Sequence, residues 1–241
     1  MPRFPRVFRC FAVGLAVFLT LGSAHAQDVK GIAADFASVR ALYGEHISFD
    51  VWRNGTLVGA QTVNFSERDG ALFVDIDFQL KIEALYITFY KMRYQSRSLW
   101  RNGKLVMLSA KTDRNGEVTE VDAQAASTSL KGDGPKGLFA APLDTYPTDH
   151  WNAGVISTTE LINTINGSVN KVRLVPQGVE DVQTERGVVK ATHYKYEGEI
   201  QNEVWYDADG RWVHMKFNGD DGSLIEFRCR KCFAGNGEKA S

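Results

Sequence analysis

The chain has 241 residues, of which 44% are hydrophobic, 24% charged and 11% aromatic, and its formal net charge is −1. This ordinary globular composition excludes collagen-like, coiled-coil and wholly disordered chains. A net charge near zero lacks the basic excess that nucleic-acid-binding proteins carry, so we expect no nucleic-acid partner.

Residues 1–26 have the pattern of a secretory signal peptide. Three arginines precede an apolar run from Phe11 to Leu21, and Ala24-His25-Ala26 places small residues at the two positions that a signal peptidase reads. We expect cleavage after Ala26, which leaves a periplasmic chain with 25 basic and 29 acidic residues, a net charge of −4. Because the apolar run is shorter than the about 20 residues of a membrane-spanning helix, we expect no stable membrane insertion.

The N-terminal segment of the exported chain, residues 27–44, carries one short helix pattern. Apolar residues recur there at helical spacing and predict about three turns between Ala33 and Leu42. The residues that carry this pattern are Ile32, Phe36 and Val39. We expect the helix to pack loosely on a sheet or to remain mobile.

Turn signals and strand patterns then alternate along the chain. Pairs of Asn-Gly or Asp-Gly, which tolerate the positive φ of a type I′ hairpin, stand at 54–55, 69–70, 102–103, 115–116, 209–210 and 221–222. Between them, apolar and polar residues alternate, which indicates antiparallel strands with one packed face and one wet face. The predicted strands are 45–53, 56–66, 71–82, 85–101, 104–113, 117–126, 128–131, 168–177, 188–197, 199–207, 211–218 and 223–231.

A stretch rich in Gly and Pro, from Gly132 to Pro147, separates a first meander from a second. It is compatible with a domain linker, but we favour one continuous sheet, because open edges on a short second block would invite aggregation. A sheet of so many strands must curl. The predicted fold is therefore all-β, a single wide antiparallel meander over 45–232 curled into a barrel or half-barrel, with a short turn within 151–164 and a disordered tail at 233–241.

Several segments together resemble an exported bacterial family known as domain of unknown function 6134. They are Leu42-Tyr43-Gly44, Phe49-Asp50-Val51-Trp52-Arg53-Asn54-Gly55, Tyr86-Ile87-Thr88-Phe89-Tyr90, Thr148-Asp149-His150-Trp151-Asn152, and the run from Trp205 to Val213. The resemblance covers most of residues 42–228 and implies an all-β exported domain without an assigned activity. More distantly, a wide curled sheet is similar to the half-barrels that carry lipoproteins across the periplasm, a comparison of architecture alone.

Cys229 and Cys232 are the two cysteines that remain after export, and they are expected to pair in an oxidising compartment. A redox C-x-x-C belongs at the start of a helix, where the dipole lowers the pKa of the first thiol, whereas this pair ends a predicted strand. A structural zinc site needs four ligands, and the sequence has no second cysteine pair. We therefore predict a structural disulfide that requires a turn at Arg230-Lys231.

The loop Asp149-His150-Trp151-Asn152 offers an acid, an imidazole, an indole and an amide in succession. Loops on a rigid sheet often carry functional groups, so a hydrolase that uses Asp149 and His150 is one hypothesis. No G-x-S-x-G elbow supplies a nucleophile, and we predict no catalytic residue. The favoured interpretation is that Trp151 plugs one end of the sheet while Asp149 or Asn152 caps a turn.

The remaining histidines and charged rows suggest surface positions. Three histidines lie far apart without metal-binding spacing, so we expect neither a metal nor a cofactor; they are His46, His193 and His214. Asp75 and Asp77 share a strand face, and the next strand carries a similar row: Lys91, Arg93, Gln95 and Arg97. Such rows usually form the solvated face, although an inward strand would make them a polar lining.

Aromatic content provides the last functional clue, because 10 Phe, 5 Trp and 8 Tyr remain after removal of residues 1–26. A large curled sheet either fills its concave face with such side chains or leaves a cavity for an apolar guest. The first hypothesis is a non-catalytic periplasmic binding or carrier module for a lipophilic or envelope ligand. Its candidate ligand-binding residues are Tyr86, Tyr90, Tyr94, Trp151, Trp205 and Trp212. The alternatives are an envelope interaction or scaffold protein and the hydrolase described above.

Overall fold

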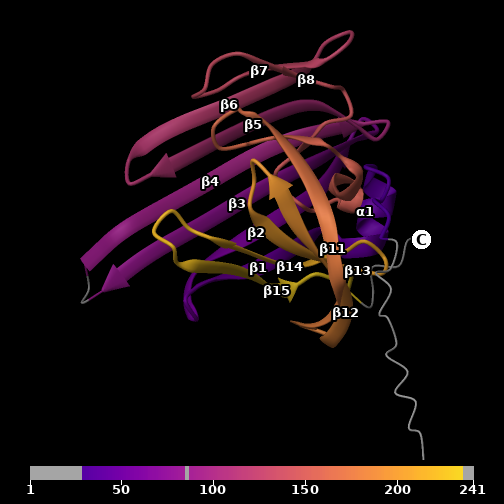
Figure 1. Ribbon diagram of the computed structural model, residues 1–241. Coiled ribbons are helices and arrows are strands. Elements are labelled where there is room, and N and C mark those ends of the chain that lie inside the picture. The colour runs from indigo at the N-terminus through magenta and orange to yellow at the C-terminus, as the bar shows by residue number, and fades with distance from the viewer. Residues whose placement is uncertain (1–28, 85–86, 236–241) are drawn as a thin grey trace, which may run out of the picture.

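A computed structural model describes residues 29–84 and 87–235, which form one large curled sheet with a helix packed against it (Figure 1). The predicted signal peptide and its cleavage site lie outside the described residues, as do Tyr86 and residues 236–241 of the predicted tail. Within the described ranges, no helix is long and apolar enough to cross a membrane.

The first half of the chain is an antiparallel meander in which each strand pairs with the next. The four Asn-Gly and Asp-Gly turns of this half adopt positive φ at both residues, for example φ 46° at Asn54 and 80° at Gly55, as type I′ hairpins require. At 209–210 and 221–222 only the glycine has positive φ, so the prediction of a type I′ turn is wrong there. These strands are β1 (His46–Arg53), β2 (Thr56–Arg68), β3 (Ala71–Ala84), β4 (Ile87–Arg101), β5 (Lys104–Arg114), β6 (Glu117–Ala125), β7 (Leu130–Asp133) and β8 (Phe139–Ala141).

The second half continues the same sheet from its other side, so the prediction of one continuous sheet is confirmed. A short parallel pair, β9 with β10, forms the far edge, and a 3₁₀ turn, η1 (Ala153–Ser157), lies between these two strands in sequence. The strands are β9 (Tyr146–Pro147), β10 (Glu160–Ile162), β11 (Val169–Thr184), β12 (Gly187–Gly198), β13 (Asn202–Asp207), β14 (Trp212–Asn218) and β15 (Leu224–Lys231).

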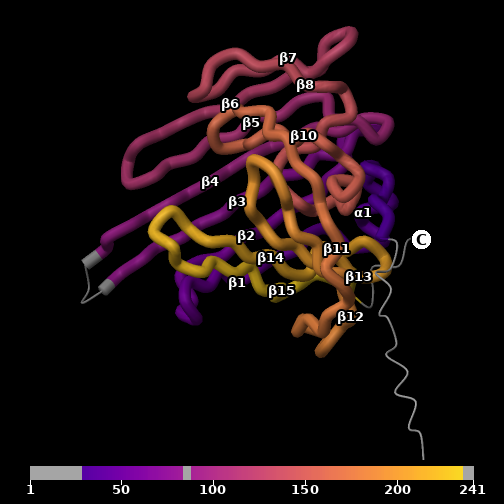
Figure 2. The backbone as a smooth tube through the Cα atoms, in the orientation of Figure 1, coloured from indigo at the N-terminus to yellow at the C-terminus, as the bar shows by residue number. Residues whose placement is uncertain are grey.

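Pairing between β1 and β15 joins the two halves, and the sheet is curled but not closed, with β8 and β9 at its edges (Figure 2). Two details differ from the sequence prediction. The short strands β8, β9 and β10 fall in segments rich in turn residues and were not predicted. β11 continues to Thr184 instead of ending near residue 177, because a bulge leaves Gln177 unpaired while Pro176 and Gly178 on either side of it stay paired with β12.

The strand register places the hairpins at two opposite ends of the sheet. Arg53 pairs with Ile225, Gly59 with Leu80, and Met92 with Arg114. The β1–β2, β3–β4, β5–β6 and β14–β15 hairpins therefore lie at one end, which we call the mouth end. The β2–β3, β4–β5 and β13–β14 hairpins lie at the other, which we call the closed end.

The helix α1 (Phe36–Tyr43) and the segment 149–157 cover the closed end. Asp35 caps the helix by accepting a hydrogen bond from Ser38 N at 2.9 Å. The expectation of a loosely packed or mobile helix is wrong, since Val39 and Tyr43 are fully buried. Trp151 is also fully buried, and its indole meets Trp100 edge to face with 5.5 Å between ring centroids.

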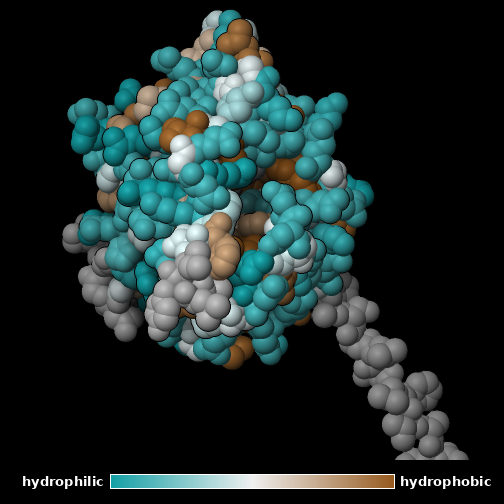
Figure 3. Space-filling view, turned by 90° about the vertical axis from the view of Figure 1, so that its left-hand side faces the viewer, coloured by the Kyte–Doolittle hydropathy of each residue, from teal (hydrophilic) through white to brown (hydrophobic). Residues whose placement is uncertain are grey.

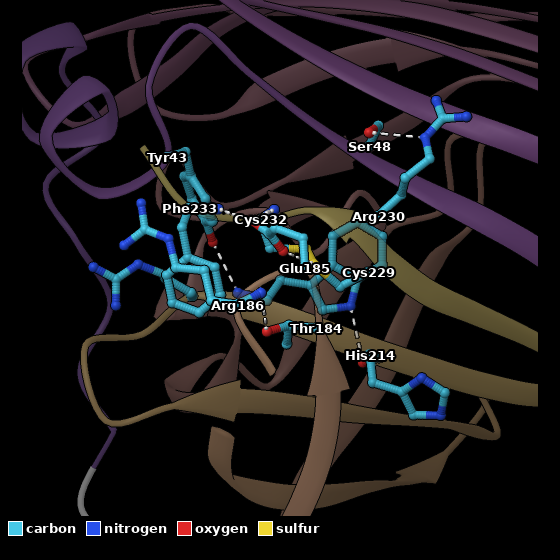
Figure 4. The surroundings of a disulfide bond; sticks show 12 residues. Tyr43, Ser48, Thr184, Glu185, Arg186, His214, Cys229, Arg230, Cys232 and Phe233 are labelled. Atoms are coloured by element: carbon cyan, nitrogen blue, oxygen red, sulfur yellow. Dashed lines mark hydrogen bonds between the residues drawn. A yellow bond between two sulfur atoms is a disulfide. The ribbon is translucent and has the colours of Figure 1, made fainter. Parts of the chain in front are cut away.

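The Cys229–Cys232 disulfide joins two residues at the end of β15, and hydrogen bonds attach this segment to the β11–β12 turn (Figure 4). Glu185, in that turn, accepts hydrogen bonds from the backbone N–H groups of Cys232 and Phe233 at 2.9 and 3.0 Å. Phe233 is buried and contacts the guanidinium of Arg186, 4.9 Å from its ring centroid. The predicted disordered tail therefore begins too early, because Phe233 packs against the domain.

Candidate functional site

A cavity of about 620 Å³ lies between the two arms of the curled sheet. One arm is β3 and β4, and the other is β14 and β15. Alternation places every second side chain of these strands on the concave face, which makes the lining predominantly apolar. The apolar lining residues of these strands are Ile76, Phe78, Leu80, Ile82, Tyr90, Met92, Tyr94, Trp212, Met215, Phe217, Ile225 and Phe227.

Aromatic rings fill part of the concave face and leave the rest hollow. Phe227 stacks on Phe78 with centroids 5.7 Å apart, and it also contacts Phe217 and Trp212 at 6.2 and 6.3 Å. The Phe78–Phe227 contact joins the two arms, whereas the contacts with Phe217 and Trp212 lie within the β14–β15 arm. The cavity therefore has an aromatic wall where the arms meet.

Charged side chains gather where the cavity opens, at the mouth end. Arg53 Nη2 lies 2.6 Å from Asp221 Oδ2, and hydrogen bonds from Ser223 and Arg53 hold the pKa of Asp221 well below its usual range. Arg114 and Glu199 also line this opening. Figure 3 looks onto this end of the molecule and shows a hollow with hydrophobic residues around and inside it.

At the inner end, the segment 148–150 and residues 163–165 close the cavity. His150 has φ +59° and is the central residue of a γ-turn in which Trp151 N donates to Asp149 O at 2.9 Å. This conformation is rare and strained for a residue with a side chain. It is held in place because Tyr206 Oη donates to the His150 carbonyl oxygen at 2.9 Å.

Burial makes the inner end uncharged at neutral pH. Desolvation raises the pKa of Asp149 to about 8, so this carboxyl group stays protonated at pH 7. Desolvation also lowers the pKa of His150 to about 4, so the imidazole stays neutral. Both residues line the cavity, which therefore ends in polar groups without charge.

The predicted ligand-binding residues fall into three groups. Tyr90, Tyr94 and Trp212 line the cavity. Trp151 and Trp205 lie elsewhere, the first within the plug of the closed end and the second on the convex face. The remaining candidate, Tyr86, is outside the described residues.

The position of Trp205 follows from strand alternation. Its neighbour Tyr206 points inward and bonds to His150, so Trp205 points to the convex face. There it stacks on His193 with 4.1 Å between ring centroids and donates from Nε1 to Glu180 at 2.9 Å. These contacts cover Trp205 on the convex face, where its exposed fraction is 3%.

Sequence reasoning missed the aliphatic and methionine part of the lining, which includes Met92, Met215 and Ile225. The signal was present, because these residues alternate with charged ones along predicted strands. Alternation identifies the packed face, however, and does not separate packed positions from positions that border a void.

Among the described residues, the His150 region and the disulfide region each lack groups that catalysis or metal binding needs. The His150 ring is bonded through Nδ1 to Tyr196 Oη at 3.1 Å, whereas a nucleophile–base pair needs a nucleophile on one ring nitrogen and an orienting group on the other. Possible ligand atoms of Glu185, Cys229 and Cys232 lie within 4.8 Å of one another, but the two sulfur atoms are bonded to each other and offer no thiolate.

Comparison with known proteins supports the fold and leaves activity open. The model of a family described as Domain of unknown function (DUF6134) matches residues 49–230. No curated protein matches the chain. A solved structure, a beta-barrel-like protein of domain of unknown function DUF1849 from Brucella abortus, is similar with a TM-score of 0.56 and 11% identity, covering 86% of this chain and 98% of that one.

Proposed function

This chain belongs to the DUF6134 family, and we propose that it is a non-catalytic binding or carrier module that holds a lipophilic or envelope-derived ligand in its cavity. The observation that carries the proposal is the space of about 620 Å³ between apolar side chains of the two sheet arms. Small-molecule sites are clefts of roughly 300–1,000 Å³ with mainly apolar walls and a few convergent polar groups. The cavity has this size and this lining.

The distribution of charge supports one orientation of the ligand. The neutral Asp149 and His150 at the inner end can accept or donate a hydrogen bond but do not balance a charge. Charged groups such as Arg53 and Arg114 stand at the opening. We therefore propose an amphiphile whose apolar body enters the cavity while any charged end stays at the mouth.

The proposed compartment is the periplasm. The signal-peptide pattern of residues 1–26 supports it, and a disulfide between the two remaining cysteines is compatible with it. In that compartment an apolar molecule that leaves one membrane must cross water, and an apolar cavity removes its surface from water.

Two alternatives remain as hypotheses. A hydrolase is favoured by one observation: Asp149 and the strained His150 border the cavity, and the pKa values of both side chains are shifted. An envelope scaffold would use the sheet edges β8 and β9, since the loop around Trp151 is buried.

The test combines native mass spectrometry with a fluorescent probe. Protein purified after export from its own host is expected to retain an apolar small molecule, and the emptied protein is expected to bind the uncharged probe N-phenyl-1-naphthylamine. In Met92→Trp the larger side chain fills part of the cavity, so probe affinity should fall at least about tenfold, which corresponds to roughly 1.4 kcal/mol.

Gln95→Trp is the matched control, because Gln95 lies three residues along the same strand on the exposed convex face, where it donates to Asp77 at 2.8 Å. This variant should bind the probe as the wild type does. Equal probe affinity in the wild type and in Met92→Trp would refute the binding proposal, and so would the absence of any retained molecule in the exported protein.

A further inference from the structure

Six hairpins carry a large apolar residue at the same position, two residues after the turn glycine. At the closed end these side chains are buried, with exposed fractions of 2%, 1% and 1% for Leu72, Leu105 and Trp212. At the mouth end the equivalent side chains are exposed, with fractions of 53%, 49% and 36% for Leu57, Val118 and Leu224. The same position after the turn glycine is therefore buried at the closed end and exposed at the mouth end.

The direction of the strands explains why this position is buried at one end and exposed at the other. It does not explain why an exposed position carries an apolar residue. Ile225 points into the cavity, so its neighbour Leu224 points to the convex face. The same alternation turns Leu57 outward, because it pairs with Trp52, whereas Arg53 lines the cavity. Outward positions of an antiparallel sheet are ordinarily polar, so apolar residues at three outward tips need a separate reason.

Phe89 adds a fourth apolar group at this end, on the β3–β4 hairpin. Tyr90 pairs with Ile82 and Thr88 pairs with Glu83, so Phe89 is the extra residue of a bulge and has no residue opposite it. Its exposed fraction is 63%. Of the six large hydrophobic residues that are exposed among the described residues, four therefore lie on the mouth-end hairpins, while Leu138 and Val188 lie elsewhere.

Ion pairs balance charges at these hairpins. Lys81 Nζ lies 2.6 Å from Glu83 Oε1 on β3, and Arg53 Nη2 lies 2.6 Å from Asp221 Oδ2 between β1 and the β14–β15 turn. A surface with paired charges is not drawn to anionic lipid by net attraction. It fits a zwitterionic bilayer, in which apolar side chains enter the boundary between headgroups and acyl chains.

We propose that the mouth-end hairpins dock on a zwitterionic lipid bilayer through Leu57, Phe89, Val118 and Leu224, so that the cavity opens against the membrane. The inference rests on the proposed function, because it gives the route by which a lipophilic ligand enters the cavity. The four side chains stand on the tips of four different hairpins. Separate tips suit a fluid surface better than a rigid protein partner, which needs a closely fitted contact area.

The test is co-sedimentation of the exported, full-length protein with phosphatidylcholine vesicles at low and high salt. The wild type is expected to bind at both salt concentrations. The triple variant Leu57→Ser, Val118→Ser, Leu224→Ser should bind at least fivefold more weakly, and Phe89→Ser should weaken binding further when added. Val188→Ser is the matched control, because Val188 is 62% exposed on the β11–β12 hairpin away from the mouth, and it should leave vesicle binding unchanged.

Three results would overturn the inference: no binding of the wild type to these vesicles, equal binding of the triple variant, or binding only to anionic vesicles with loss at high salt. Size-exclusion chromatography should show the same monomer for the wild type and the triple variant. A wild-type dimer that the triple variant loses would instead assign the tips to a second copy of the chain.

Probe binding in solution separates this inference from the proposed function. The triple variant should bind N-phenyl-1-naphthylamine with wild-type affinity, because none of its three residues lines the cavity. If Met92→Trp leaves probe affinity unchanged while the triple variant still loses vesicle binding, the cavity proposal fails and the docking surface stands.

Discussion

The hydroxyl of Tyr43 donates a hydrogen bond of 2.7 Å to the carbonyl oxygen of Trp151, 108 residues further along the chain. The same hydroxyl accepts a hydrogen bond of 2.9 Å from the backbone N–H of Trp212. One buried side chain thereby connects α1, the plug segment and β14. Burial raises the pKa of Tyr43 above its ordinary value, so this hydroxyl remains a donor at every physiological pH.

We expect Tyr43→Phe to lower the free energy of unfolding by about 1–3 kcal/mol, because it leaves a buried N–H and a buried carbonyl group without their partner. Urea unfolding followed by tryptophan fluorescence measures the change. Tyr90→Phe is the control, since the Tyr90 hydroxyl donates at 3.5 Å to the Met92 sulfur, which is a weak acceptor. Equal stability of both variants would show that the Tyr43 contacts do not hold the closed end.

Reduction of the Cys229–Cys232 disulfide should lower stability by about 2 kcal/mol, the value expected for the loss of a short cross-linked loop. Thermal unfolding with and without dithiothreitol measures this effect. The double variant Cys229→Ser, Cys232→Ser should have the stability of the reduced wild type and should not respond to dithiothreitol. A response of the double variant would trace the effect of the reductant to something other than this bond.

The stability of the protein should fall as the pH rises from about 6.5 to about 8, because of Asp149. Its pKa is raised from 3.8 to about 8 by burial, so in this window the folded state keeps a proton that the unfolded state has lost. The free energy of unfolding falls by about 1.4 kcal/mol for each pH unit over which the folded state binds one proton more than the unfolded state. His150 acts in the opposite sense, but only between about pH 4 and 6.5, because its pKa is lowered to about 4.

Asp149→Asn should remove this loss of stability above pH 6.5, and urea unfolding at pH 6.5, 7.2 and 8.0 measures it. Asp144→Asn is the control, because Asp144 is exposed and should leave the slope unchanged. A wild-type curve that is flat, or that rises, over this range would contradict a protonated Asp149.

The charged row on the convex face should contribute little to stability and nothing to ligand binding. Arg97 Nε lies 2.6 Å from Asp75 Oδ1, but the Arg97 side chain is 59% exposed, and exposed ion pairs add about 0–1 kcal/mol. Arg97→Ala should therefore unfold within about 1 kcal/mol of the wild type and bind N-phenyl-1-naphthylamine equally. A large loss of probe affinity would place the ligand on this face.

Much of the sheet could be predicted because hairpins are local structures. A pair such as Asn102-Gly103 favours positive φ whatever surrounds it, and period-2 alternation on either side marks two strands. The strands β8, β9 and β10 were missed because they are two to three residues long, which is too short to show period-2 alternation. The extension of β11 past residue 177 was missed because Pro and Gly ordinarily end a strand, and here a bulge lets the pairing with β12 continue.

The candidate site was predicted in part, and the errors have physical causes. Tyr90, Tyr94 and Trp212 line the cavity because they lie on inward positions of long strands. Trp205 was predicted as a ligand-binding residue because of its size, but its side chain lies on the convex face. There it stacks on His193 and donates a hydrogen bond to Glu180. Size and aromatic character do not specify the face of a strand, which depends on register.

Local chemistry along the chain was sufficient to determine the all-β class, the hairpin positions, the pairing of two cysteines and the solvated row around Asp77. Those features depend on neighbours a few residues apart. The tertiary structure alone decided that β1 pairs with β15, that the curled sheet stays open around a hollow, and that Asp149 is buried deeply enough to keep its proton. Such properties arise from contacts between residues more than a hundred positions apart, and burial and voids exist only after the whole chain has packed.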